Sequence, residues 1–211
     1  MGAGALVSDQ VQDGAHPHYL DAVRRAEQAL RSEFRSLAVA HAAFPMLTAW
    51  GVEDFSHTIH SLGCNYLAAV GREAGFWAMS EYPVRVPSRS AAHSVRPDVA
   101  WWERVSGEAV VLGEFERAEA RKPVKLADKA RNLLQAHQAL GERPRLLLLV
   151  GWALAGTDLG DRDAVRGVMA SGFRAADGTP VRGLGRSSAF LLATAVFGDV
   201  GGGRKLLAVL T

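Results

Sequence analysis

Three carboxylates stand close together in two short segments that are otherwise largely apolar. Asp98 follows Pro97 at the start of one segment, and Glu114 and Glu116 close the run 110–116, which begins Val-Val-Leu. If both segments are strands, Glu114 and Glu116 point to the same side, because side chains alternate along a strand. Gathering like charges is costly unless a cation compensates them. The three acids therefore predict a site for a hard divalent cation, Mg²⁺ or Mn²⁺, which oxygen ligands favour.

A simpler interpretation gives these acids no chemistry. Glu114 and Glu116 would lie on a solvated strand edge, and Asp98 would cap the turn that follows the proline. For an arbitrary pair of strands this interpretation is the commoner one. The elements around the acids must therefore distinguish the two.

Hydrophobic periodicity and turn residues divide the chain into helices and strands. Helical spacing predicts helices over 18–43, 52–73, 123–141 and 161–175, and β-rich texture predicts strands over 76–86, 96–105, 107–117 and 144–153 and a closing hairpin over 187–211. The link 105–108 is of hairpin length, so the two acid-bearing strands should be antiparallel neighbours. The following helix is long enough for a parallel crossover. We expect one α/β domain with a mixed central sheet flanked by helices.

In this order the segments resemble the PD-(D/E)XK nuclease superfamily, the restriction-endonuclease-like enzymes. The resemblance covers about residues 55–153, as helix, strand, Pro-Asp strand, Glu-X-Glu strand, helix and apolar strand. It implies a restriction-endonuclease-like core, with a helical extension over 18–54 before it and a helix and hairpin over 154–211 after it. The activity implied is divalent-metal-dependent hydrolysis of phosphodiester bonds in DNA.

The resemblance assigns roles to the acids and to one further residue type. By position, Asp98 and Glu114 match the metal ligands of the family, and both belong to its catalytic set. Glu116 falls where the family usually has lysine, although some restriction endonucleases carry glutamate there. Other members place the lysine on the following helix, where this chain offers Lys125 and Lys129 beside the apolar stripe that should pack on the sheet.

Two alternatives remain open at this point. The lysines can belong to a solvated basic face with no catalytic part. The chain can also be a catalytically degenerate nuclease-like fold that acts as a DNA-binding or assembly module, since Glu116 replaces the usual lysine.

Basic residues near the acids predict a nucleic-acid surface, most simply for DNA. Arg96 precedes Asp98, and Arg117, Arg121 and Lys122 follow the acid pair. Cationic side chains meet the phosphate backbone in such complexes. Short basic clusters also arise by chance in a chain with this many basic residues. The resemblance adds a homodimer as an assembly to test, because many relatives dimerise to cut two strands.

His57 and His60 are candidate metal ligands, and the thiol of Cys64 is a candidate nucleophile. His57 and His60 lie three apart on a predicted helix, a spacing that can share a metal, but no third ligand is evident, so we expect structural roles. Cys64 is the single cysteine, which excludes an internal disulfide and a multi-cysteine zinc site. Its apolar helical context predicts a buried, inert thiol.

Net charge and the distribution of apolar residues narrow the functional classes to which this protein can belong. The 211 residues carry a formal net charge of +2, which neither demands nor excludes a nucleic-acid partner. The first residues lack the basic and apolar regions of a signal peptide, and segment 1–17 should be a flexible tail. The longest apolar stretch, 146–154, is about half a membrane span. We expect a cytoplasmic protein with no membrane association.

Overall fold

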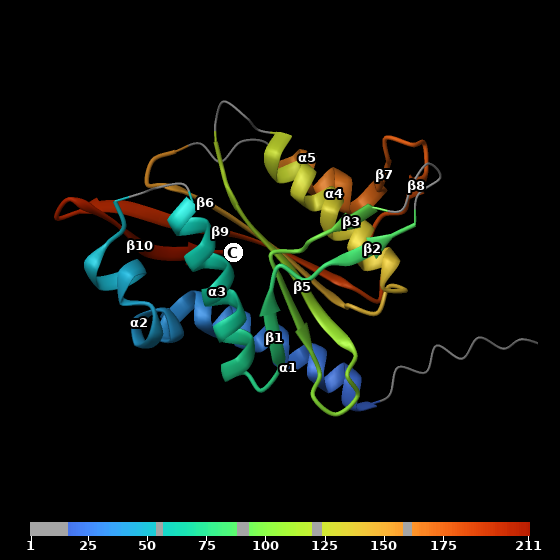
Figure 1. The fold of residues 1–211 in the computed structure, drawn as a ribbon, viewed down its shortest axis with the longest axis horizontal. Coiled ribbons are helices and arrows are strands. Elements are labelled where there is room, and N and C mark those ends of the chain that lie inside the picture. Colours follow the sequence, from blue (N-terminus) through green and yellow to red (C-terminus); the bar gives the residue numbers. More distant parts are fainter. Residues whose placement is uncertain (1–16, 54–56, 88–92, 120–123, 158–161) are drawn as a thin grey trace, which may run out of the picture.

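The computed structural model describes residues 17–53, 57–87, 93–119, 124–157 and 162–211 (Figure 1). The predicted tail lies outside these ranges apart from Pro17, and so do Arg121 and Lys122. The chain forms a mixed α/β fold around a six-stranded sheet with helices on both faces. The predicted fold class is therefore confirmed, including the N-terminal helix. Among the described residues, no helix combines the length and the apolar character needed to cross a membrane.

The predicted helices and strands follow one another in the predicted order, with further short elements between them. The helices are α1 (Pro17–Ser36), α2 (Ala38–Ala43), α3 (His57–Glu73), α4 (Val124–Ala139) and α5 (Arg162–Ser171), with a short π-helix η1 (Met46–Trp50). The strands are β1 (Trp77–Ser80), β2 (Val84–Val86), β3 (His93–Val95), β4 (Val99–Trp102), β5 (Ala109–Arg117), β6 (Leu146–Leu154), β7 (Phe173–Arg174), β8 (Pro180–Val181), β9 (Ala189–Val200) and β10 (Gly203–Leu210). The main sheet has the order β1-β4-β5-β6-β9-β10, while β2–β3 and β7–β8 form separate two-stranded sheets.

The strands that carry the acids pair as expected. β4 and β5 are antiparallel, and Val99 faces Gly113 across the pair. α4 then carries the chain back so that β6 lies parallel to β5. All of β6 except Leu154 is buried, because its apolar run lies between two helical layers. The closing hairpin of β9 and β10 is also present, with antiparallel pairing.

The helices divide the core into two parts, one on each face of the sheet (Figure 1). On one face α1, α2 and α3 pack around a cluster that includes Trp101, Phe115 and Trp152. On the other face α4 and α5 pack on a cluster that includes Leu112 and Leu149. From Val111 onward, odd-numbered residues of β5 face α3 and even-numbered residues face α4, as alternation along a strand requires. Glu114 and Glu116 consequently belong to the α4 side.

The helix predicted over 18–43 is in fact two helices. The chain breaks at Leu37, whose φ of 51° is left-handed. The Glu33 carboxylate accepts hydrogen bonds from the backbone N–H groups of Val39 at 2.9 Å and Ala40 at 3.1 Å. A buried carboxylate that satisfies the free N–H groups of a helix start stabilises the break. The apolar periodicity continues across the break and therefore did not reveal it.

Other predicted boundaries were also wrong. The helix predicted from 52 is described from His57 onward, and Val52 instead forms a β-bridge with Arg204. The helix predicted over 161–175 ends at Ser171, because Gly172 has a φ of 72°, a conformation that commonly terminates helices.

The strand predicted over 76–86 is split between two sheets. β1 ends at Ser80, Glu81 has a left-handed φ of 53°, and β2 then pairs with β3 outside the main sheet. Pro83 lies in this break and has no N–H for a ladder hydrogen bond. The strand predicted over 96–105 is likewise shorter, and only Val99–Trp102 is strand.

Candidate functional site

The carboxylates of Asp98 and Glu114 meet where β4 begins beside the second half of β5, at the end of the strand pair away from the hairpin loop. Continuing the antiparallel register beyond the Val99–Gly113 pair places Asp98 opposite Glu114, so both side chains share one face. Both are buried, with exposed fractions of 5% for Asp98 and 0% for Glu114. The Oδ2 atom of Asp98 also accepts the Phe115 backbone N–H at 2.8 Å, which fixes the orientation of that carboxylate.

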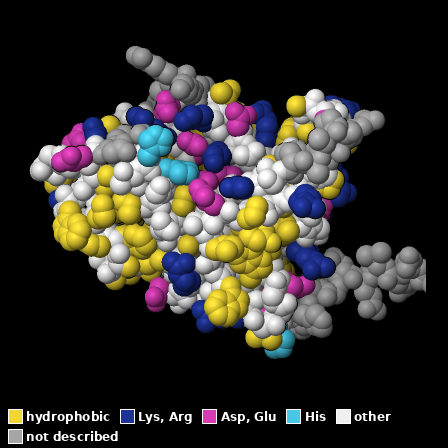
Figure 2. Space-filling view, viewed as in Figure 1, with side chains coloured by type: hydrophobic (Ala, Val, Ile, Leu, Met, Phe, Trp, Pro, Cys, Tyr) yellow, Lys and Arg dark blue, Asp and Glu magenta, His cyan; other side chains and the backbone are white. Residues whose placement is uncertain are grey.

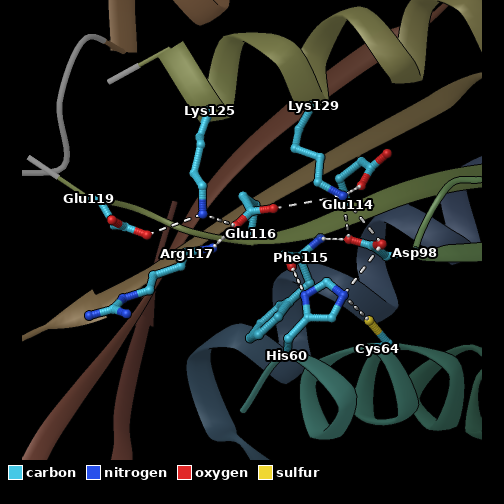
Figure 3. A network of polar contacts seen from close by, with 10 residues as sticks. All are labelled: His60, Cys64, Asp98, Glu114, Phe115, Glu116, Arg117, Glu119, Lys125 and Lys129. Atoms are coloured by element: carbon cyan, nitrogen blue, oxygen red, sulfur yellow. Dashed lines mark hydrogen bonds and ion pairs between the residues drawn. The ribbon is translucent and has the colours of Figure 1, made fainter. Parts of the chain in front are cut away.

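Lys129 of α4 supplies the positive charge that this pair requires. Its Nζ lies 2.6 Å from Glu114 Oε2, 3.4 Å from Asp98 Oδ2 and 3.8 Å from Glu116 Oε2 (Figure 3). Burial by itself lowers the pKa of the Lys129 ammonium, but the charges of Glu114 and Asp98 outweigh burial and hold that pKa above its usual value. Lys129 is therefore a permanent ammonium at the centre of the three acids.

Glu114 has one oxygen with no partner. Burial, and next the negative charge of Asp98, raise the pKa of Glu114 well above its usual value, and Lys129 opposes them only in part. Among the described residues, Glu114 Oε1 is buried without a hydrogen bond. Buried polar atoms normally have partners, so this oxygen has an unused ligand position. Together with Asp98 it forms a hard oxygen donor set that fits Mg²⁺ or Mn²⁺.

Glu116 belongs to a neighbouring, more open network. Its Oε1 accepts the Arg117 backbone N–H at 2.8 Å and lies 3.4 Å from Lys125 Nζ. Lys125 also contacts Glu119 Oε1 at 3.1 Å. Lys125 lies nearer the start of α4, but it pairs with the outer carboxylates Glu116 and Glu119. Lys129 lies one turn further along α4 and reaches the buried pair of Asp98 and Glu114.

A cleft of about 260 Å³ opens beside these groups. Its walls carry two histidines, two acids, three basic residues and an indole: His57, His60, Glu116, Glu119, Arg117, Lys125, Lys129 and Trp152. Figure 2 shows histidine, acidic and basic side chains side by side on this face of the molecule. A cleft with charges of both signs can hold an anion against the lysines while the acids act on it.

The predicted nucleic-acid residues are only partly described. Arg96 is exposed, and Arg117 is half-buried with its guanidinium carbon 5.9 Å from the centre of the Trp152 ring. Arg121 and Lys122 lie outside the described residues. The structure therefore places Arg117 in the cleft wall. A role in nucleic-acid binding stays a prediction for this residue as well as for Arg96, Arg121 and Lys122.

His60 and Cys64 join the site, which the sequence analysis missed. His60 Nδ1 lies 2.7 Å from the Phe115 carbonyl oxygen, and its Nε2 lies 3.7 Å from Asp98 Oδ1 and 3.6 Å from Cys64 Sγ (Figure 3). His57, the partner suggested by spacing, is exposed on the cleft wall instead. The signal overlooked was the spacing of four between His60 and Cys64, which puts both on one side of α3.

The thiol of Cys64 is buried, as predicted. Burial, followed by the negative charge of Asp98, raises its pKa above the usual value. The free side chain is therefore a thiol and not a nucleophilic thiolate.

No known protein family, curated protein or solved structure matches this chain.

Proposed function

We propose that this protein is a divalent-metal-dependent nuclease that hydrolyses phosphodiester bonds in DNA. The observation that carries the proposal is the buried pair of Asp98 and Glu114 with the Lys129 ammonium 2.6 Å from Glu114. Two hard oxygen ligands and a cation beside a charged cleft are the groups that metal-assisted phosphodiester hydrolysis requires. The resemblance of residues 55–153 to the PD-(D/E)XK superfamily supports the same activity. A cytoplasmic location is part of this proposal.

Each group has a distinct part in this mechanism. Asp98 and Glu114 would hold Mg²⁺ or Mn²⁺, which acidifies a water molecule and offsets negative charge when bound. Lys129 would turn from the carboxylates toward the phosphate in the cleft, where its ammonium offsets the charge that develops during the reaction. Glu116 lines the cleft and is half-buried, so it can accept a proton as general base. Lys125 orients Glu116 through the contact at 3.4 Å.

The proposal extends to the way DNA is held. Arg96, Arg117, Arg121 and Lys122 would contact the phosphate backbone around the acidic centre. A homodimer would let two such centres cut both strands. These contacts position the substrate and carry no sequence information by themselves.

Cleavage of supercoiled plasmid tests the activity. With Mg²⁺ or Mn²⁺ the unaltered protein should convert the plasmid to nicked and linear forms, and chelation with EDTA should stop the reaction. Asp98→Asn should lower the rate by roughly 100-fold or more, as expected when an electrostatic group of the reaction is lost. Asp163→Asn is the matched control, because Asp163 is an exposed carboxylate on α5 that pairs with Arg166 at the surface. Its rate should be unchanged.

The nuclease assignment is wrong if the unaltered protein leaves plasmid, single-stranded DNA and RNA intact with both metals. Calorimetric titration with Mn²⁺ tests the ion site separately. Binding that is equally tight in Glu114→Gln would remove Glu114 from the ligand set.

The degenerate DNA-binding module remains the second candidate function. The observation that favours it is that Lys129 already neutralises the acids while Glu116 stands in the position of the usual lysine. An electrophoretic shift of DNA that stays intact in the presence of Mn²⁺ would establish this function in place of the nuclease.

A further inference from the structure

A nitrogen, a sulfur and an oxygen donor converge on the α3 side of Asp98. His60 Nε2 lies 3.6 Å from Cys64 Sγ and 3.7 Å from Asp98 Oδ1, and all three donor atoms lie within 4.8 Å of one another. His60 and Cys64 come from adjacent turns of α3, while Asp98 precedes β4 (Figure 3). The donors are thus held by two elements that pack on each other.

The hydrogen bond of His60 fixes which ring nitrogen is available. The Phe115 carbonyl oxygen, 2.7 Å from Nδ1, can only accept a hydrogen bond, so Nδ1 carries a proton. In the neutral ring the lone pair is then on Nε2, which faces Asp98 and Cys64. Metal-binding histidines usually donate their second N–H to a backbone carbonyl or carboxylate in this way. His60 is therefore oriented as a ligand before any ion arrives.

The donor separations fit a small tetrahedral ion. With metal–ligand distances of about 2.0–2.3 Å, neighbouring donors around tetrahedral zinc lie roughly 3.3–3.6 Å apart. The two separations from His60 Nε2 are close to this range. The side chain of His60 is 31% exposed, which leaves solvent access for a fourth ligand.

We propose that His60, Cys64 and Asp98 form a binding site for a thiophilic divalent cation, with Zn²⁺ as the natural occupant. Sulfur and imidazole select zinc over Mg²⁺, whereas the Asp98–Glu114 oxygens select the harder ions. On binding, Cys64 releases its thiol proton to solvent and its sulfur binds as thiolate. The site does not depend on the nuclease proposal, because its ligands and their geometry are complete without it.

One consequence does rest on the proposed function. Asp98 belongs to both donor sets, so a zinc ion held by Asp98 Oδ1 draws this carboxylate away from the hard-ion site. Zn²⁺ at the His60–Cys64–Asp98 site therefore inhibits the Mg²⁺-dependent reaction. Cys64→Ser relieves this inhibition, because it removes the sulfur ligand and leaves the acids in place.

Cobalt substitution tests the site on the unaltered chain. Co²⁺ should bind with the near-ultraviolet charge-transfer absorption of a cobalt–thiolate bond, and one equivalent of Zn²⁺ should abolish this absorption. Cys64 is the single cysteine, so the band has one source. The proposal is overturned if Co²⁺ produces no thiolate band, whether or not the protein cleaves DNA.

Zinc titrations of three variants identify the ligands. Cys64→Ser and His60→Gln should weaken zinc binding by about 100-fold or more, since loss of an outer-shell partner alone costs about 10–100-fold. His57→Gln is the matched control, because His57 lies on the same helix but outside the donor cluster, and its affinity should not change. Circular dichroism checks that each variant is folded. Equal zinc affinity in all three variants would contradict the assignment.

The cleavage assay then separates this inference from the proposed function. A cobalt–thiolate band without any cleavage by metal-loaded protein would uphold the zinc site and reject the nuclease. Cleavage without the band would uphold the nuclease and reject the zinc site.

Discussion

The Lys129 ammonium balances the negative charge of the Asp98 and Glu114 carboxylates. Two buried carboxylates on neighbouring strands repel each other, and the Lys129 ammonium lies within 3.4 Å of both. Breaking such a buried arrangement is costly because it leaves charge without a partner. An exposed ion pair, by contrast, contributes little. Lys129 forms a buried ion pair and Lys125 a more exposed one, so substitutions of these two lysines of α4 can be compared directly.

Lys129→Met should lower the free energy of unfolding by about 3 kcal/mol in metal-free buffer, because Asp98 and Glu114 lose their buried counter-charge. Lys125→Met should cost less than about 1 kcal/mol, since the Lys125 side chain is 38% exposed and pairs with the outer acids Glu116 and Glu119. Urea denaturation in the presence of EDTA measures both values. Similar losses in the two variants would show that Lys129 is not the main counter-charge.

Helix α3 owes its position on the sheet to a close contact at a glycine. A Cβ atom at Gly63 would lie 2.1 Å from the Phe115 ring, so the helix and β5 approach too closely for any side chain there. The Phe115 ring also stacks on Trp152, with ring centres 6.1 Å apart. Because His60 lies one turn before Gly63, this contact also sets the distance between His60 and the acids.

Gly63→Ala should destabilise the protein by about 1–3 kcal/mol, as overpacking of a filled core does. Gly167→Ala should instead stabilise it by about 0.5–1 kcal/mol, because Gly167 is exposed within α5 and nothing lies within 4 Å of its added Cβ. Thermal or urea unfolding measures the two changes. Opposite signs are expected, and a neutral Gly63→Ala would mean that α3 can shift without cost.

Helix α4 carries a buried histidine that should make stability depend on pH. Burial lowers the pKa of the His137 imidazole below its usual value. Its contribution is therefore complete above the unfolded pKa of about 6.5 and is lost as the pH falls through the lower folded pKa. Urea midpoints at several pH values between neutral and mildly acidic should fall more steeply for the unaltered protein than for His137→Gln. Parallel curves would contradict the prediction.

In the whole molecule, the sheet separates two helical layers. α4 lies over the acid cluster (Figure 3), and α1 lies on the opposite face of the sheet (Figure 1). The net charge of +2 is too small to attract DNA to every surface. If the proposed function holds, DNA should bind on the cleft side, and salt should weaken that binding.

Arg96→Gln should reduce the slope of log affinity against log salt by about 1, because one phosphate contact is lost. Arg24→Gln is the control, since Arg24 is exposed on α1 and pairs with Asp21 at the surface. Its slope should equal that of the unaltered protein. Fluorescence anisotropy with labelled DNA in EDTA measures all three slopes, and an unchanged slope for Arg96→Gln would exclude that residue from the binding surface.

The order of elements was predictable because local patterns determine it. Alternation and the hairpin-length link placed Asp98 beside Glu114, and the apolar run of β6 predicted a buried strand, as observed. Boundaries were less predictable. The break at Leu37 depends on the Glu33 carboxylate, and the end of β1 depends on a left-handed Glu81 and on pairing elsewhere, which no periodicity records.

Local patterns were enough to predict the acid pair on adjacent strands, the mixed sheet and the helix that supplies lysines, because strand and helix periods are properties of neighbouring residues. That Lys129 and not Lys125 reaches the buried carboxylates depends on tertiary packing. The tertiary structure also brought His60 and Cys64 to Asp98 from the other side of the sheet. These contacts depend on how closely α3 and α4 pack on β5, and that distance is set by side chains far apart in the chain.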